Sequence, residues 1–269
     1  MNWLQCIIYG LVSGLSEFMP VSSLAHQQIL RELFGIDRAD VVQELFIHIS
    51  ALAALFYGCN NLFDQIKRGS RIPRHNKRHA DASLDIRLVK TAAAPMLIIY
   101  LIIAYSIKQI TSLPLMTLFL ILNGIITFIS SRMLQGNKDA RSMSKMDAFL
   151  LGSTSALSAL PGFSRVGIGT SFAISRGADR LHALNWSLLL SIPVLILFSG
   201  MDLVGLFSAA NLAEVTGNVL GYFLSACGSF AGGYAGILLM RFLAVKVGFS
   251  GFVYYSWGAA LFTFVLYLL

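Results

Sequence analysis

Six long apolar runs constrain this chain more than any other feature of its sequence. Each is close to or above the roughly 20 residues that an α-helix needs to cross a bilayer. They cover residues 43–62, 90–108, 114–133, 183–206, 216–242 and 249–269. Charged residues make up only 12% of the 269, and the mean hydropathy is +0.72, whereas a soluble domain carries about 25% charged residues. The sequence therefore predicts an all-α polytopic membrane protein, with residues 1–269 in a single membrane domain.

The net charge of +7 follows a membrane pattern and does not indicate a nucleic-acid-binding surface. Lys and Arg gather in four connections, at 64–89, 132–145, 176–180 and 241–246. Threading the six runs through a bilayer places all four connections on the same side, and Lys and Arg are enriched on the cytoplasmic side of membranes. We therefore expect the basic connections to be cytoplasmic and both termini to be extracytoplasmic.

Two further apolar stretches are too short to cross a bilayer, and both end near a proline. One runs from Trp3 to Leu15 and is followed by Pro20, and the other covers 148–160 and is followed by Pro161. A serine stands three residues after each proline. Because proline removes a backbone donor, it interrupts a helix. Short interrupted segments at corresponding places in two halves of a chain are typical of inverted-repeat membrane proteins.

Three of the six full runs follow each interrupted segment, and an odd number of crossings inverts the second copy of a repeat. We therefore expect an inverted repeat of two halves, 1–135 and 136–269, each a re-entrant half-helix pair plus three transmembrane helices. The backbone groups that the prolines free need protein partners or a water-filled cavity. The sequence predicts that the two tips meet near the midplane and form one polar site.

Polar residues at the two tips are the candidates for the chemistry of this site. They are Glu17, Ser22, Ser23, His26, Ser164 and Arg165. A charge at the bilayer centre costs at least about 2.5 kcal/mol, so Glu17 and Arg165 indicate a functional site, with a structural ion pair as the alternative. Arg165 offers a planar fork for phosphate oxygens. Ser23 could attack phosphorus if His26 takes its proton, and Glu17 could hold a divalent cation. At this depth the expected substrate is a lipid phosphate.

These motifs resemble those of the undecaprenyl-pyrophosphate phosphatase family, the bacterial bacitracin-resistance phosphatases. The first motif is Gly14-Leu15-Ser16-Glu17-Phe18-Met19-Pro20-Val21-Ser22-Ser23, followed by His26, and the second is Pro161-Gly162-Phe163-Ser164-Arg165. The resemblance covers nearly the whole chain in order, including the stretch 185–193. It implies a multi-pass enzyme of the bacterial plasma membrane that removes the terminal phosphate of undecaprenyl pyrophosphate, and the product is the carrier lipid of cell-wall synthesis.

The resemblance also assigns roles to single residues. It places the nucleophile on Ser23, the catalytic histidine on His26, the retained glutamate on Glu17 and the phosphate-binding arginine on Arg165. Ser22 and Ser164, which lie at the tips, are the further candidate substrate-binding residues. It implies a divalent cation, Mg or Ca, with Glu17 as a ligand, and it admits a homodimer. The chain departs from the family pattern at Ser13, where the family has a second glutamate, and at three hydroxyl positions, which are here Leu24, Val166 and Gly169.

Two other kinds of membrane protein share part of this pattern. A transporter with the same fold could bind a polyprenyl phosphate and move it across the bilayer without hydrolysis, since interrupted helices at the midplane are also typical of transporters. The Ser175-Arg176 pair with His182 fits the spacing of type-2 phosphatidic-acid phosphatases. Trp186 stands where that group has the aspartate that orients its histidine, so we interpret these residues as part of a cytoplasmic loop.

Overall fold

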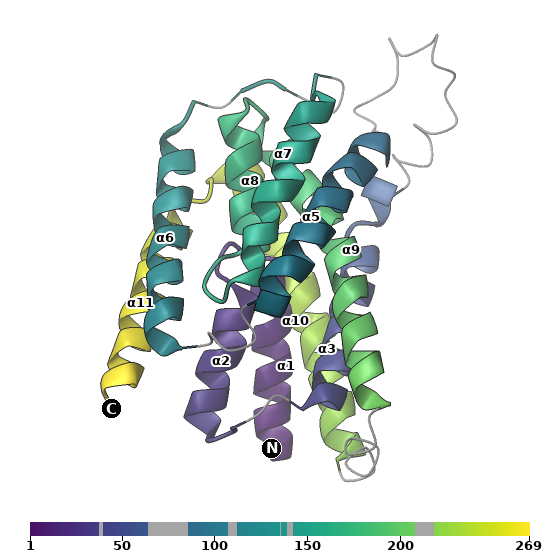
Figure 1. Cartoon of the computed structure of the whole chain (residues 1–269), viewed down its shortest axis with the longest axis vertical. Helices are drawn as coiled ribbons and strands as arrows, with labels where there is room; N and C mark the ends of the chain where they lie inside the picture. The colour runs from purple at the N-terminus through teal and green to yellow at the C-terminus, as the bar shows by residue number, and fades with distance from the viewer. Residues whose placement is uncertain (38–39, 64–85, 107–111, 135, 139–141, 208–217) are drawn as a thin grey trace.

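The computed structural model describes residues 1–37, 40–63, 86–106, 112–134, 136–138, 142–207 and 218–269. Within these residues the regular structure is helical, and an isolated β-bridge joins Lys138 to Ala178. Residues 64–85 of the basic connection lie outside the described residues. The helices, drawn in Figure 1, are α1 (Trp3–Glu17), α2 (Ser23–Phe34), α3 (Val41–Gly58), α5 (Ile86–Ser106), α6 (Leu113–Arg132), α7 (Lys145–Ser155), the 3-10 turn η2 (Ala156–Ala159), α8 (Arg165–Ser175), α9 (Arg180–Leu206), α10 (Val219–Lys246) and α11 (Gly251–Leu268).

Six of the described helices are long and apolar enough to cross a bilayer, namely α3, α5, α6, α9, α10 and α11. They correspond to the six apolar runs, which confirms the all-α polytopic fold class. Their ends differ from the runs by a few residues, because polar caps extend some helices beyond the apolar sequence. For example, α9 begins at Arg180, where the Asp179 side chain accepts the N–H groups of Leu181 and His182.

The four shorter helices form two hairpins with their tips at mid-height of the bundle (Figure 1). The α1–α2 hairpin enters from the end that holds both termini, whereas the α7–α8 hairpin enters from the opposite end. The half-crossings that the prolines indicated are therefore present. The repeat boundaries, 1–135 and 136–269, stay a prediction.

Small residues allow α1 to lie directly against α10. A Cβ atom at Gly14 would sit 2.1 Å from the carbonyl oxygen of Ser229, and one at Gly232 would sit 2.2 Å from that of Leu11. Close backbone approach through small residues is a common way for helices to associate in lipid. This packing anchors the first hairpin at the depth of its tip.

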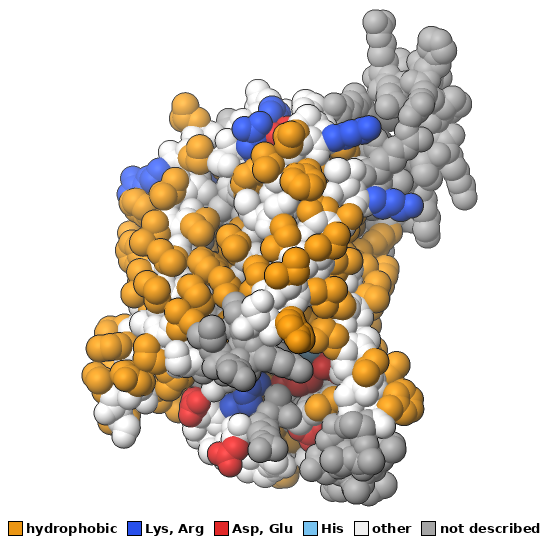
Figure 2. Space-filling view, in the orientation of Figure 1, with side chains coloured by type: hydrophobic (Ala, Val, Ile, Leu, Met, Phe, Trp, Pro, Cys, Tyr) orange, Lys and Arg blue, Asp and Glu red, His pale blue; other side chains and the backbone are white. Residues whose placement is uncertain are grey.

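Basic residues mark one end of the bundle. Arg132 ends α6, Lys145 begins α7, Arg180 begins α9 and Lys246 ends α10, and Figure 1 places these helix ends opposite the termini. Figure 2 shows hydrophobic side chains across the middle of one face and Lys or Arg side chains mostly at its upper end. The described helix ends that carry these basic residues therefore share one end of the bundle.

Candidate active site

The first tip places Glu17 and Ser23 at neighbouring helix ends. Helix α1 ends at Glu17, and α2 begins at Ser23 after the break at Pro20. Ser22 caps α2, with its hydroxyl oxygen 3.4 Å from the N–H of Ala25. Its φ of +65° is in the left-handed region, which non-glycine residues seldom adopt. The Ser22 hydroxyl also accepts the N–H of Gly162 at 3.0 Å, so a contact from the second tip holds this conformation in place.

The second tip places Arg165 at the first position of α8. The chain leaves η2, passes Pro161 and turns at Gly162, whose φ is +115°. A Cβ atom at Gly162 would lie 2.6 Å from Cβ of Phe119, so this turn requires glycine. Ser164 then caps α8: its hydroxyl accepts the N–H of Gly167 at 3.0 Å. The same hydroxyl donates to the carbonyl of Met19 at 2.8 Å.

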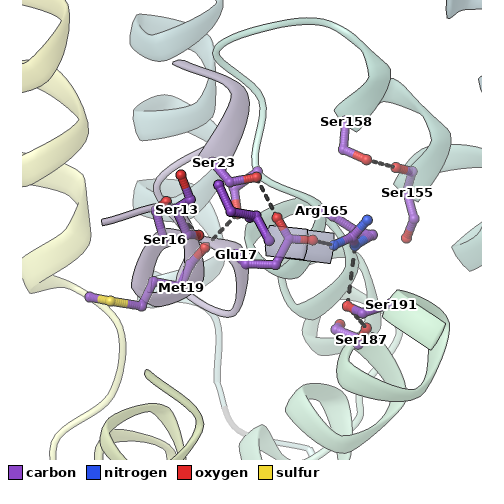
Figure 3. A network of polar contacts seen from close by, with 12 residues as sticks. Ser13, Ser16, Glu17, Met19, Ser23, Ser155, Ser158, Arg165, Ser187 and Ser191 are labelled. Atoms are coloured by element: carbon purple, nitrogen blue, oxygen red, sulfur yellow. Dashed lines mark hydrogen bonds and ion pairs between the residues drawn. The ribbon is translucent and has the colours of Figure 1, made fainter. Parts of the chain in front are cut away.

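Glu17, Ser23 and Arg165 form a hydrogen-bonded chain across the two tips (Figure 3). The Ser23 hydroxyl donates to Glu17 Oε2 at 2.5 Å, and Arg165 Nη2 forms an ion pair with Glu17 Oε1. Arg165 Nε donates to the hydroxyl of Ser191 at 3.2 Å. Glu17 and Arg165 are each only 7% exposed. The prediction that two motifs far apart in the sequence meet in one site is confirmed, and the ion pair lies beside a serine hydroxyl.

His26 occupies a different position from the one expected for a base acting on Ser23. Its Nδ1 lies 2.8 Å from the carbonyl oxygen of Ser22 and its Nε2 lies 2.7 Å from the hydroxyl of Tyr255, on which the ring stacks. A carbonyl can only accept, so Nδ1 carries a proton, and in the neutral ring Nε2 accepts from Tyr255. The Ser23 hydroxyl is bonded to Glu17, which makes Glu17 the group placed to take the serine proton.

A narrow polar cleft at the tips adjoins a larger apolar cavity. The cleft has a volume of about 20 Å³, room for about one water molecule. It is lined by Ser16, Glu17, Ser23, Leu24, Tyr100, Ser158, Phe163, Ser164, Arg165 and Phe198. The apolar cavity, of about 240 Å³, shares Leu24, Tyr100 and Phe198 with the cleft and extends to Arg31 and Met201. The cleft in this structure is therefore too small to hold a phosphate group.

The groups around Glu17 do not fit a Mg or Ca site. Both oxygens of its carboxylate are engaged, one by Arg165 and one by Ser23. Among the described residues, no three His, Cys, Asp or Glu side chains lie close enough to hold a metal ion, whereas Ca²⁺ takes six to eight oxygen ligands and Mg²⁺ six. Ser13, one turn before Glu17, is 1% exposed, and its hydroxyl has no hydrogen-bond partner within the described ranges.

The other acidic side chains of the spans lie with other partners. Glu44 on α3 accepts the hydroxyl of Tyr9 at 2.6 Å and lies 3.7 Å from Arg31. Asp202 on α9 lies 2.7 Å from Nδ1 of His48. Neither carboxylate lines the cleft around Glu17. These residues therefore add no ligand to the proposed cation position.

Ser191 and Asn123 contact the residues of the tips but were not among the predicted site residues. Ser191 accepts a hydrogen bond from Arg165. It lies in the stretch 185–193, which belongs to the weaker part of the family resemblance. Asn123 on α6 contacts both tips. In the sequence it stands out only as an amide in the middle of an apolar run. A single amide cannot be assigned a partner before the fold is known.

The residues that fit the phosphatidic-acid phosphatase spacing are held in structural contacts. Arg176 Nε donates to Asp147 at 2.6 Å. Burial raises the pKa of Asp147, but hydrogen bonds from Arg176 and Ser144 outweigh this and lower the pKa to about 2. His182 Nε2 accepts the indole N–H of Trp186 at 2.8 Å, so this nitrogen is not available as a nucleophile. These contacts fit a loop that fastens the base of the second hairpin.

Comparisons with known proteins find similarity over nearly the whole chain. Residues 6–262 match the family described as bacitracin resistance protein BacA. An undecaprenyl-diphosphatase of Carboxydothermus hydrogenoformans is 27% identical over 261 residues, covering 96% of this chain and 94% of the relative. One from Hahella chejuensis is 29% identical, covering 95% and 94%. Undecaprenyl-diphosphatase 2 of Stutzerimonas stutzeri is also 29% identical, with the same two coverages.

Proposed function

The chain belongs to the bacitracin resistance protein BacA family, and from this premise we propose that it hydrolyses undecaprenyl pyrophosphate to undecaprenyl phosphate and inorganic phosphate. The observation that carries the proposal is the buried chain of Ser23, Glu17 and Arg165, formed by two hairpin tips inside a multi-pass membrane protein. It supplies a hydroxyl, a proton acceptor and a cation within one cleft.

In the first step, Ser23 Oγ attacks the terminal phosphorus of the lipid pyrophosphate. The Oγ–P bond forms while the bond from that phosphorus to the bridging oxygen breaks, and undecaprenyl phosphate leaves with the electron pair. Glu17 Oε2, which already accepts the serine hydrogen at 2.5 Å, takes the proton. A positioned base typically contributes about 10²–10⁴-fold to the rate of such a step.

Arg165 has to exchange its partner when the substrate binds. As the phosphate enters, the guanidinium moves from Glu17 Oε1 to the phosphate oxygens, for which its planar fork is suited. This exchange frees Glu17 to act as a base and places a fixed positive charge where negative charge develops, which is a major source of catalysis. Ser191 holds Arg165 Nε from the other side.

In the second step, water attacks the phosphorus of phosphoserine. The Oγ–P bond breaks, the proton held by Glu17 returns to Ser23 Oγ, and the proton of the water passes to a phosphate oxygen and leaves with inorganic phosphate. No step is assigned to His26, whose contacts with Ser22 and Tyr255 give it a role in holding the start of α2. Ser22 and Ser164, whose hydroxyls link the tips, position the site rather than bind the phosphate.

The apolar cavity next to the cleft is proposed to receive the first part of the polyprenyl chain. It extends from the tips toward Arg31, on the side of the bundle that holds the termini. With both termini extracytoplasmic in the bacterial plasma membrane, the substrate enters from the outer leaflet. The homodimer stays a prediction.

The test is phosphate release from undecaprenyl pyrophosphate by the purified, detergent-solubilised protein. Wild type should release phosphate, and Ser23→Ala should abolish release while keeping most lipid binding. Arg165→Ala should weaken both, since a hydrogen bond to a charged group contributes about 1.5–3 kcal/mol. Ser153→Ala is the matched serine control, because Ser153 lies on α7 outside the cleft and, within the described residues, its hydroxyl donates back to the carbonyl of Phe149.

Folded wild-type protein that binds the lipid and never releases phosphate would refute the proposal. The remaining function would then be that of a polyprenyl-phosphate transporter, tested by Arg165-dependent lipid movement in vesicles. Phosphate release that persists in Ser23→Ala would support the proposed reaction but show that Ser23 is not its nucleophile.

A further inference from the structure

Asn123 is a buried amide that contacts both hairpin tips at once. It lies midway along α6 and is 0% exposed. Its Nδ2 donates to the carbonyl oxygen of Pro20 at 3.0 Å in the first tip. Its Oδ1 accepts the N–H of Ser164 at 3.0 Å in the second tip. Nδ2 also lies 3.2 Å from the hydroxyl of Ser256 on α11, so this amide uses both its donor and its acceptor ends.

The two backbone groups that Asn123 binds lie within three residues of Ser23 and Arg165 in the sequence. Pro20 stands three residues before Ser23, and its carbonyl lies in the break between α1 and α2, where no helical donor is available. The N–H of Ser164 belongs to the residue directly before Arg165. A shift of either group therefore moves Ser23 or Arg165 relative to Glu17.

We propose that Asn123 is a positioning residue, which sets the register of the two tips and so holds Ser23 and Glu17 against Arg165. The tips come from opposite ends of the bundle, and each is attached to different helices. Besides the Glu17–Arg165 ion pair, hydrogen bonds from Gly162 to Ser22 and from Ser164 to Met19 join them directly. Asn123 is a further connection, and it is anchored on a full transmembrane helix that neither hairpin includes.

The expected consequence of losing this amide is a loss of rate more than a loss of affinity. A displacement of about 1 Å in a reacting group can cost about 100-fold in rate. Asn123 is not among the residues that line the cleft, so its removal takes no contact from the phosphate. Asn123→Ala should lower kcat for phosphate release by about 10- to 100-fold and leave KM within about threefold.

Thr127→Val is the matched control on the same helix. Thr127 is 2% exposed, and its hydroxyl donates only to the backbone carbonyl of Asn123 itself. The substitution also removes a buried hydrogen bond from α6 but touches neither tip. Its kcat should stay within about twofold of wild type. Equal losses of kcat in Asn123→Ala and Thr127→Val would overturn the proposal, because they would reflect general damage to α6.

Amide hydrogen exchange tests the positioning without requiring hydrolysis. Asn123→Ala should exchange faster than wild type in segments 18–23 and 161–167, whereas Thr127→Val should not. The kcat measurement rests on the proposed phosphatase activity, whereas the hydrogen-exchange measurement does not. An inactive wild type would therefore refute the activity, and hydrogen exchange at the tips would still decide whether Asn123 positions them. If Asn123→Ala does not fold, Asn123→Ser enters the same comparisons. Unchanged exchange at the tips, or unchanged kcat in a folded variant, overturns the proposal.

Discussion

At the scale of single residues, the site depends on one carboxylate that serves two partners. Glu17 binds Arg165 through one oxygen and the hydroxyl of Ser23 through the other. A buried charge of this kind is stable only when it is paired and hydrogen-bonded. The arrangement keeps the resting site neutral, and a phosphate that displaces Glu17 from Arg165 makes the carboxylate available as a base.

Glu17→Gln tests this dual role. The amide keeps the size of the side chain and can still contact Ser23, but it is a far weaker base. We expect kcat for phosphate release to fall by about 10²–10⁴-fold, the range that a general base contributes. Steady-state phosphate assays on folded variant and wild type measure it. His26→Gln is the informative comparison, because a larger loss of kcat there than in Glu17→Gln would transfer the role of base to His26.

The second residue-scale prediction concerns the divalent cation. One carboxylate with both oxygens engaged, beside the Ser13 hydroxyl, does not provide a hard cation with its usual oxygen ligands. We therefore expect phosphate release by the wild type to persist within about twofold in excess EDTA, because Arg165 supplies the positive charge. A wild type that is active with Mg or Ca and inactive in EDTA contradicts this prediction.

Ser13→Glu supplies the gain-of-function comparison. It places a second carboxylate one turn before Glu17, on the same face of α1. Phosphate release by this variant should become dependent on added Mg or Ca. Ser13→Gln, of the same length without the charge, should remain insensitive to EDTA.

At the scale of elements, the depth of the first tip is set by the packing of α1 on α10. Gly14→Ala should destabilise the protein, since the added Cβ would lie 2.1 Å from the carbonyl oxygen of Ser229. Overpacking of this kind costs about 1–3 kcal/mol. Gly200→Ala is the matched control, because Gly200 is also a glycine within a helix but has open space around its Cβ. It should be neutral or stabilising by up to about 1 kcal/mol. Thermal unfolding in detergent compares the two, and equal midpoints would refute the packing argument.

The elements of the fold were largely predictable from the sequence, and the reasons are physical. A bilayer demands long apolar helices, so the six runs identified the six spans. The start of α7 at Lys145 was missed, although Ser144 and Asp147 form a capping box there and the pattern of a serine followed three residues later by an acidic residue was present in the sequence. The predicted segment began at residue 148, where the apolar stretch starts, and not at the cap.

The contacts of the site were only partly predictable. Glu17, Ser23 and Arg165 were identified because charges inside a membrane need partners. His26 follows Ser23 by three residues, which suggested a base for the serine, but its ring is turned to Tyr255 by a contact that spans 229 positions. Asn123 could not be assigned for the same reason, since its partners lie 103 and 41 positions away. Local patterns carry no information about such pairs.

At the scale of the whole molecule, the arrangement of charge indicates which way the protein lies in the membrane. The described helix ends that carry Arg132, Lys145, Arg180 and Lys246 share one end of the bundle, and the termini share the other (Figure 1). Because Lys and Arg are enriched on the cytoplasmic side, we expect the basic end to be cytoplasmic and the apolar cavity to open toward the outer leaflet. A lipid pyrophosphate presented there would reach the tips without crossing the membrane first.

Labelling of single cysteines tests this orientation. Cys227 is exposed and is first replaced by alanine, whereas Cys6 and Cys59 are buried. A cysteine introduced at Leu269, at the end of α11, should react with a membrane-impermeant maleimide added to intact cells. One introduced at Lys145, at the start of α7, should react only after the cells are permeabilised, since its helix end is on the basic side. The reverse pattern would place the termini in the cytoplasm and turn the cavity toward the inner leaflet. The phosphatase chemistry at the tips would still be possible, but its substrate would have to arrive from the cytoplasmic side.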